Sequence, residues 1–367
     1  MSTTAFGVND SSAVKIWSKY VAVAEREYAE VSRLIGDENS IIHARNELEK
    51  GKGDQVKFTL LTDLSGAGFT EGQRAEGNGE GLTHYQDSIL INELGHVVGV
   101  RSENTIDAQR VQFDLRAQAR DRLANWWARR KSASFFNHMC GYTPANTESV
   151  TSGTKFTGLN SVTAPAGATG LVRQIWPSTI TTDQDLISSN TFGLDLIDKA
   201  VTRAEVGAVP IRPIMVGGQP RYVVYMHPVQ AENLRTNTSA GQWREIMLAR
   251  LQGGEKEANP LVSGALGVYN KCILRVTQDI TNGVNSSTGA AVTNTRRAVL
   301  LGAQAAVCAY GMKTNPGKGR YRWSEKLLDH DRELEVGAWG IWGKKKTKFN
   351  SVDFGVMVLS TYAADPA

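Results

Sequence analysis

Cysteine is scarce in this sequence, and its placement argues against the structures that cysteine usually builds. The 367 residues contain only Cys140, Cys272 and Cys308, which lie far apart. A disulfide framework uses an even set of cysteines, and a structural zinc site typically uses closely spaced pairs. We therefore expect three buried thiols that behave as small apolar side chains.

Long apolar runs are also missing. No stretch of about 18 apolar residues occurs, the length at which a membrane-spanning helix is considered. The first residues lack the basic segment followed by an apolar segment that marks a secretion signal. We expect a protein that has no membrane partner and that stays in the cytosol of the cell that makes it.

The short motifs of common active sites are absent as well. A phosphate-binding loop needs Ser or Thr after its Gly-Lys pair, but Gly319 follows Lys318 here. The sequence has neither a GxSxG nucleophile elbow nor an HExxH zinc motif, and its six histidines form no ligand-spaced pair. We predict a protein that is not an enzyme and has no metal or cofactor. An enzyme whose site is scattered along the sequence is the alternative from another functional class.

Positive charge is present but modest, with a net charge of +4. A dedicated nucleic-acid-binding protein is usually far more basic, so that class is disfavoured, although one surface could still rest against DNA. The densest basic run is Lys344, Lys345 and Lys346, placed between two predicted strands. We expect a solvent-exposed turn there, with phosphate contact as the alternative.

Residues 12–35 carry the clearest periodic pattern of the chain. Apolar residues recur at alternating spacings of three and four, which predicts a helix with one apolar face. The positions are Val14, Trp17, Val21, Ala24, Tyr28, Val31 and Ile35. Such a face must be buried, either on its own domain or on a neighbouring subunit. For the second case we identify Trp17, Val21 and Tyr28 as candidate interface residues.

Residues 53–101 predict a long β-hairpin with a glycine-rich tip. Two segments rich in Val, Ile, Leu, Thr and Phe flank a stretch with six glycines between Gly66 and Gly81. An isolated two-stranded hairpin is marginally stable in water, so this one requires a partner surface. The charged tip residues Glu71, Arg74 and Glu76 are candidate contacts with adjacent subunits.

A second long helix is predicted over residues 104–139. Apolar residues spaced by three and four form one stripe, while Arg116, Arg120, Trp127 and Lys131 form a separate edge. Like charges four residues apart destabilise a helix by about 0.2–0.5 kcal/mol. This edge is therefore predicted to face an acidic surface, and its four residues are further interface candidates, with a solvated helix face as the alternative.

The remaining sequence predicts a mixed α+β unit. A helix is expected within 185–206, followed by a hairpin that turns at Gly217 and Gly218 and a short helix after His227. Strands are expected over 271–280, 333–350 and 353–363, and residues 296–311 form a buried segment of either type.

The order of these elements resembles the Hong Kong 97-like capsid fold of tailed-phage major capsid proteins. Local similarity, including similarity to the group named for the coliphage N-four capsid protein, lies in residues 222–235, 259–280, 296–311 and 340–363. The resemblance implies five parts. These are an N-terminal arm (1–50), an extended β-hairpin or E-loop (51–101), a spine helix with the first part of the peripheral P-domain (102–185), an axial A-domain (186–330) and C-terminal strands that close the P-domain (331–367).

The resemblance also implies a function and partners. Copies of the chain would form hexamers and pentamers of an icosahedral virion shell enclosing double-stranded DNA, contacted without sequence specificity. Some members crosslink through a hairpin lysine, but no lysine occurs between Phe58 and Arg130, so we predict a shell without that crosslink. A separate scaffolding protein and a decoration protein are expected partners. Another virion protein, a portal or tail-tube subunit, is the alternative, although a portal would show a longer helical stem.

Overall fold

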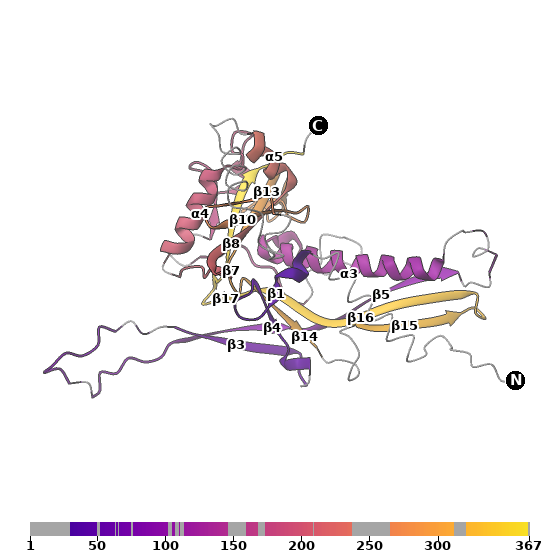
Figure 1. Cartoon of the computed structure of the whole chain (residues 1–367), viewed down its shortest axis with the longest axis horizontal. Helices are drawn as coiled ribbons and strands as arrows, with labels where there is room; N and C mark the ends of the chain where they lie inside the picture. The colour runs from indigo at the N-terminus through magenta and orange to yellow at the C-terminus, as the bar shows by residue number, and fades with distance from the viewer. Residues whose placement is uncertain are drawn as a thin grey trace.

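The molecule is a compact unit with two extensions that point in opposite directions (Figure 1). This computed structural model describes residues 30–49, 52–62, 64, 66–74, 76–101, 105–106, 110, 114–145, 159–167, 173–207, 209–236, 265–311 and 321–365. One extension is the hairpin of β3 (Gln55–Leu61) and β4 (His84–Leu90). The other contains α3 (Leu115–Met139), β5 (Asn92–Arg101), β15 (Tyr321–Leu328) and β16 (Glu333–Lys346).

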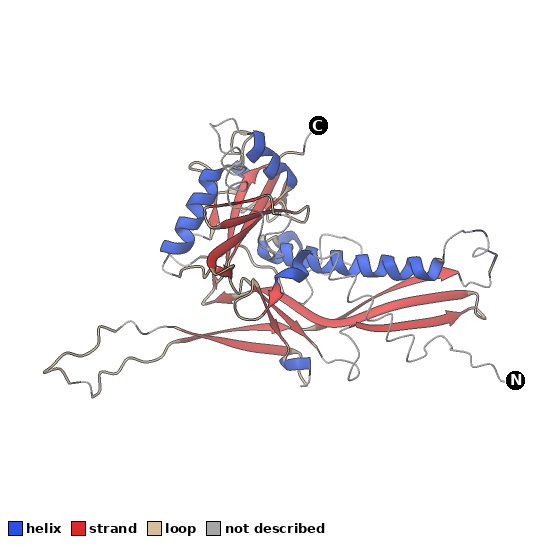
Figure 2. Ribbon diagram, in the orientation of Figure 1, coloured by secondary structure: helices blue, strands red, loops and turns tan. Residues whose placement is uncertain are grey.

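The compact unit is built on a seven-stranded sheet with the order β6-β19-β13-β8-β10-β9, in which β7 also pairs with β8. Its strands are β6 (Gln174–Ile175), β7 (Ile214–Val216), β8 (Gln219–Met226), β9 (Gly267–Tyr269), β10 (Cys272–Val276), β13 (Thr295–Leu301) and β19 (Val356–Tyr362). The helices α4 (Leu194–Val206) and α5 (Pro228–Thr236) pack on one face, as Figure 2 shows. The C-terminal turn of α3 packs on the other face through Phe135, Phe136 and Met139.

Both faces of this sheet are therefore buried, and its sequence reflects that. In β8, Val223 and Tyr225 point toward α3, while Val224 and Met226 point toward α4 and α5. A strand buried on both sides needs apolar residues at consecutive positions. All three cysteines are buried, as predicted.

A second sheet runs along the other extension with the order β1-β2-β14-β16-β15, and β5 pairs with β16. Here β1 is Ile35–Gly36, β2 is Ile42–Arg45 and β14 is Ala306–Tyr310. The N-terminal half of α3 covers one face, where Leu123 and Trp127 pack on Val336 and Ala338. The short elements are η1 (Glu30–Leu34), η2 (Glu47–Glu49), η3 (Thr143–Ala145), η4 (Asp183–Asp185), β11 (Gly283–Val284), β12 (Ala291–Val292), β17 (Lys348–Phe349) and β18 (Val352–Asp353).

The long helix begins later than the sequence predicts. The Asp114 carboxylate accepts hydrogen bonds from the backbone N–H groups of Arg116 (2.8 Å) and Ala117 (3.1 Å), which is the geometry of an N-cap. The predicted helix start at residue 104 is therefore wrong for α3, which begins at Leu115. No described helix is both long enough and apolar enough to cross a bilayer.

Two further predictions need correction, because the spacing of apolar residues alone does not show which sheet a strand joins. Residues 84–101 are two strands: β4 stays in the hairpin, whereas β5 pairs with β16. The prediction that residues 296–311 are a buried segment of either type is confirmed, and the segment consists of two strands, β13 and β14, placed in different sheets. The basic run 344–346 is not an exposed turn, since it forms the end of β16 and its lysines at 344 and 346 are buried.

Other predictions are confirmed. Gly217 and Gly218 connect β7 to β8 with φ angles of +59° and +79°, which favour glycine and suit a tight hairpin turn. The helices within 185–206 and after His227 are α4 and α5. Of the predicted helix 12–35, residues 12–29 lie outside the described part of the chain. Residues 30–34 form the 3-10 helix η1, and its Val31 and Leu34 are buried in the core.

Candidate functional site

The hairpin of β3 and β4 is held at its base by contacts from β16 and its flanks. The Lys345 ammonium donates to the Asp87 carboxylate and, at 3.0 Å, to the carbonyl of Ser88. The backbone N–H of Lys348 donates to the other Asp87 oxygen at 3.1 Å. A charge-assisted hydrogen bond of this kind is stronger than a neutral one, particularly where it is partly buried. The hairpin thus leaves the molecule from a fixed base.

The bend between β4 and β5 is fixed in the same region. The side chain of Asn160 makes two hydrogen bonds to Leu90, accepting from its N–H at 3.0 Å and donating to its carbonyl at 2.8 Å. A Cβ atom on Gly343 would lie only 2.0 Å from that carbonyl oxygen. Glycine is therefore needed in β16, because another backbone approaches it closely.

The far end of the hairpin is exposed and carries apolar side chains. Leu61, Leu64, Phe69 and Leu82 are between 50% and 68% exposed. The loop beyond the strands extends well away from both sheets (Figure 1). Several exposed large apolar residues at one end of a molecule indicate a surface that contacts another protein.

The predicted charged tip residues are described, and the structure shows how they are arranged. Arg74 and Glu76 form an ion pair with each other at the surface. Glu71 makes no hydrogen bond or ion pair with any described residue. Glu80 accepts a hydrogen bond from the N–H of Gly66 at 2.7 Å, which joins the two sides of the loop. An exposed pair contributes little to stability, so Arg74 and Glu76 retain their capacity to pair elsewhere.

The basic edge of α3 does face an acidic group, within the same chain. Arg116 donates to both carboxylate oxygens of Glu325 on β15, at 2.7 Å and 3.3 Å, and Glu325 is 4% exposed. Arg120 pairs with its neighbour Asp121 at 2.9 Å. The predicted acidic surface is thus β15 for Arg116, and no second subunit is required to explain the two arginines.

Trp127 and Lys131 do not lie on a surface edge. Trp127 is fully buried and packs edge-on against Tyr321, with ring centroids 4.9 Å apart. The Lys131 ammonium lies 5.0 Å from the centre of the same Tyr321 ring and 5.9 Å from that of Trp342. The expectation that these two residues face a partner is corrected by their burial, since both lie inside the subunit.

Two buried lysines escaped sequence interpretation. The Lys346 ammonium donates to the Asp353 carboxylate at 2.7 Å and to the carbonyl of Thr163 at 3.2 Å, and burial lowers the pKa of Lys346. Lys344 donates to the carbonyl of Lys131 at 3.2 Å and lies 5.5 Å from the ring centre of Phe135. Residues two apart on a strand share a face, so the spacing of Lys344 and Lys346 was the only sequence sign that both side chains point the same way.

The face of the second sheet turned away from α3 is unusually flat, which the sequence also did not reveal. Gly95 and Gly99 of β5 and Gly337 of β16 lie on it. A Cβ atom on Gly95 would lie 2.0 Å from the Trp339 ring, so the indole lies directly over this glycine. Val97 between the glycines is 41% exposed. Glycine within a strand often marks close approach by another chain, so this face is a second candidate contact surface.

A metal-binding site is formed where several His, Cys, Asp or Glu side chains converge. Among the described residues, no group of three or more His, Cys, Asp and Glu side chains is arranged to hold a metal ion. His96 instead stacks on Trp126, with ring centroids 4.4 Å apart, and burial lowers its pKa.

The sequence and the fold of this chain are similar to those of known phage capsid proteins. The chain is 25% identical over 374 residues to the major capsid protein of Pseudomonas phage KPP25, covering 95% of this chain and 94% of that protein. The capsid of Ralstonia phage GP4 is 31% identical, with full coverage of both chains and a TM-score of 0.78. The cyanophage Pam1 capsid subunit shares the fold, with 20% identity, 92% and 93% coverage and a TM-score of 0.69. The phage capsid protein family matches residues 5–365. The chain is thus a member of the phage capsid protein family, with the Hong Kong 97-like α+β fold that its order of elements predicted.

Proposed function

We propose that copies of this chain associate as hexamers and pentamers and close into the icosahedral shell of a virion that encloses double-stranded DNA. The observation that carries the proposal is the hairpin of β3 and β4. Its base is fixed by Lys345 and Asn160, while its tip exposes four large apolar residues to solvent. A fixed arm with an apolar end suits contact with another subunit.

The energetics favour assembly over an independent arm. Two strands alone bury too little apolar surface to hold a hairpin in water, and within the described part of the chain β3 and β4 pair only with each other. Removing apolar surface from water contributes about 25 cal/mol per Å². Burial of Leu61, Leu64, Phe69 and Leu82 against other subunits would therefore supply stability that the single chain lacks.

The charged and N-terminal candidates have their own places in this proposal. Glu71, Arg74 and Glu76 would set the register of the tip on its neighbour, because exposed charges contribute more to specificity than to affinity. Trp17, Val21 and Tyr28 would extend the contact from the arm over 1–50. Arg116 would act indirectly, by fixing the position of α3 against β15, while Arg120, which pairs with Asp121 on the same helix, remains an interface candidate.

Several finer assignments accompany the shell. The subunits would assemble in the host cytoplasm around a separate scaffolding protein, and the finished shell would accept a decoration protein. Within its family, the chain would belong to the group named for the coliphage N-four capsid protein. The shell would form without covalent Lys–Asn links from the hairpin tip, because no lysine lies between Phe58 and Arg130.

Electron microscopy of the purified full-length protein tests the proposal. Closed shells, or hexameric and pentameric rings, are the expected result. The variant L61S/L64S/L82S should keep the thermal unfolding temperature of the free subunit, because the three side chains are exposed, yet should lose assembly. The matched variant L61M/L64M/L82M keeps apolar contact area and should still assemble. Uniform monomers of the unmodified protein would contradict the proposal.

A further inference from the structure

A shallow polar groove lies between α3 and the segment that follows β10. Its volume is about 630 Å³, and its walls are formed by Arg122, Asn125, Ala128, Arg129 and Ser132 of α3 and by Val276, Thr277, Gln278 and Asp279 opposite them. It is distinct from the hairpin tip and from the flat glycine face. Neither the fold nor the assembly contacts described above account for it.

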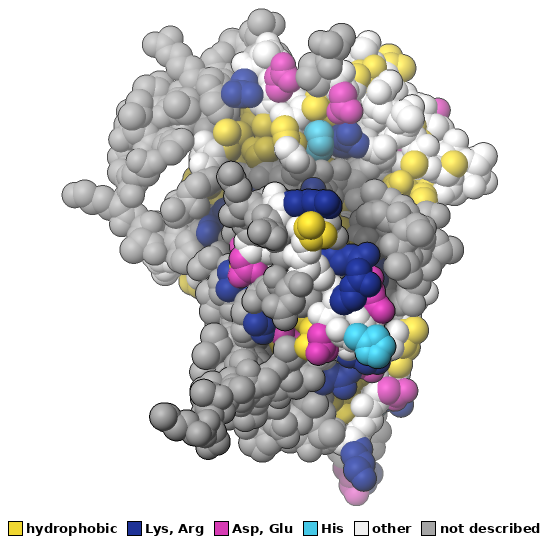
Figure 3. All heavy atoms as spheres, turned by 90° about the vertical axis from the view of Figure 1, so that its right-hand side faces the viewer, with side chains coloured by type: hydrophobic (Ala, Val, Ile, Leu, Met, Phe, Trp, Pro, Cys, Tyr) yellow, Lys and Arg dark blue, Asp and Glu magenta, His cyan; other side chains and the backbone are white. Residues whose placement is uncertain are grey.

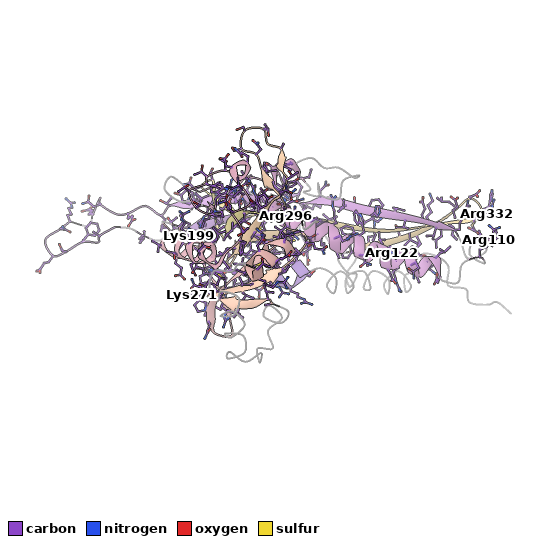
Figure 4. All side chains as sticks on the ribbon, turned by 90° about the horizontal axis from the view of Figure 1, so that it is seen from above. Arg110, Arg122, Lys199, Lys271, Arg296 and Arg332 are labelled. Atoms are coloured by element: carbon purple, nitrogen blue, oxygen red, sulfur yellow. The ribbon has the colours of Figure 1, made fainter. Side chains whose placement is uncertain are left out.

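Two arginines dominate the groove. Arg122 and Arg129 are exposed and seven residues apart, so both lie on one face of α3. Neither forms a hydrogen bond or an ion pair with another residue in the described part of the chain. This contrasts with Arg116 and Arg120 on the same helix, which are both paired. Figure 4 shows Arg122 on α3 along the arm.

The surrounding polar groups leave these two charges available. The nearby Asp121 is engaged by Arg120. Asp279 is the one acidic residue lining the groove, and it accepts a hydrogen bond from the Ser132 hydroxyl. The lining therefore carries a net positive charge, with amide and hydroxyl groups beside it. Figure 3 views the molecule from the right-hand side of Figure 1 and shows Lys and Arg side chains down the middle of that face, with Asp and Glu side chains among them.

We propose that this groove binds the phosphate backbone of double-stranded DNA through Arg122 and Arg129. Arginine pairs with phosphate in a planar two-pronged geometry, and Asn and Gln side chains add further donors. At a rise of about 1.5 Å per residue the arginines stand roughly 10 Å apart along the helix axis. This spacing spans about three nucleotide steps of one strand, at about 3.4 Å per step.

The chemistry of the groove favours duplex DNA over other occupants. Single-stranded nucleic acid is usually held by aromatic side chains that stack on bases, and the lining contains none. A protein partner usually inserts large apolar anchors, but only Ala128 and Val276 are apolar here. Phosphate groups are the same at every nucleotide, so this contact would not depend on sequence. The inference rests on the proposed function, because it assigns the enclosed DNA a contact on the subunit.

The test compares DNA affinity of full-length, unassembled protein across salt concentrations, using fluorescence anisotropy of a labelled duplex of about 30 base pairs. Each phosphate contact contributes about 0.9 to the slope of log affinity against log salt. The variant R122Q/R129Q should therefore lower that slope by roughly 1.8 and weaken binding by at least about tenfold at 0.1 M salt. R122K/R129K keeps both charges and should retain most of the affinity.

R203Q/R235Q is the matched control, because it removes the same charge from two exposed arginines on α4 and α5. Equal losses in this control and in R122Q/R129Q would overturn the groove as a DNA site. Unchanged DNA affinity with failed assembly would also overturn it and would identify the groove as a contact for another protein. Microscopy of both variants separates this result from failure of the proposed function, in which the unmodified chain itself forms no shells.

Discussion

His227 immediately precedes α5, and its role there depends on an uncharged imidazole ring. Its Nδ1 accepts a hydrogen bond from the N–H of Val229 at 3.3 Å. The backbone N–H of His227 donates to the side-chain oxygen of Gln230 at 2.9 Å, which completes a reciprocal cap around Pro228. Burial, assisted by the charge of Arg296, lowers the pKa of His227 from 6.5 to about 4, although Asp365 opposes the shift.

We predict that this cap makes the subunit sensitive to acid. Between pH 6.5 and about 4 the unfolded chain binds a proton at His227 that the folded chain does not, so stability falls as pH falls through this window. H227N keeps a capping oxygen without a titrating group and should reduce the drop in unfolding temperature from pH 7 to pH 5. The control is H330N, at an exposed turn between β15 and β16, which should leave the drop unchanged. An equal drop in H227N and the unmodified protein would contradict the assignment.

The buried pair of Lys346 and Asp353 yields a second prediction at this scale. Each side chain is almost fully enclosed, and the Asp353 carboxylate also accepts from the N–H of Ala166 at 3.0 Å. K346M or D353N alone leaves one buried group without its partner and should cost about 3–5 kcal/mol in the free energy of unfolding. The double variant K346M/D353N should cost clearly less than the sum of the two. Urea unfolding of the free subunit measures this cycle, and simple additivity would show that the two groups are not coupled.

At the scale of elements, β16 can cross the bend after β4 only because Gly343 has no side chain at the crossing point. G343A would place a Cβ atom 2.0 Å from the carbonyl oxygen of Leu90, and backbone cannot move aside easily. We expect a loss of about 1–3 kcal/mol in unfolding free energy. G99A is the matched control, because nothing lies within 4 Å of the added atom there, and its effect should stay within about 0.5 kcal/mol. Equal stability of the two variants would contradict the close approach.

The elements differ in how far the sequence could predict them. Local signals sufficed for the Gly217–Gly218 turn, for α4 and for the helix after His227, because caps, turns and apolar spacing act within a few residues. They failed for β4 and β5, which look like one strand until their partners β3 and β16 are known. They failed most clearly at Lys344 and Lys346. A lysine in a strand usually reaches solvent. The burial of these two is explained by contacts with Asp353, seven positions after Lys346, and with the distant carbonyl groups of Thr163 and Lys131.

The candidate contact surfaces also differ in how far the sequence could predict them. The glycine-rich hairpin tip could be predicted because such a loop between strands has no core of its own. The exposed apolar side chains of Leu61, Leu64, Phe69 and Leu82 were not predicted. Trp127 and Lys131 were placed wrongly, since helical spacing gives a face but not what covers it. The flat face of Gly95, Gly99 and Gly337 was invisible, because its residues come from β5 and β16, more than 200 positions apart.

At the scale of the whole molecule, a shell of this protein should dissociate into single chains under denaturing conditions. The hairpin tip offers no lysine for a Lys–Asn link, because none occurs between Phe58 and Arg130, so we expect its contacts with neighbours to be non-covalent. Purified particles boiled in detergent should give one band near 39.9 kDa on a denaturing gel. A ladder of covalent oligomers would contradict this expectation, and mass spectrometry of the ladder would locate the bond.

The position of β16 also determines how a subunit would transmit a mechanical load. Over its 14 residues it pairs with β5 and β15 along the arm and with β14 beside the compact unit, while Lys345 near its end holds the base of the hairpin. A tensile load applied at the hairpin tip would enter β16 near one end and run along its axis. There it would act on the whole ladder of backbone hydrogen bonds in shear instead of peeling them apart singly. One strand would thus transmit load between the two extensions, and in a wall built from such subunits it would resist stretching.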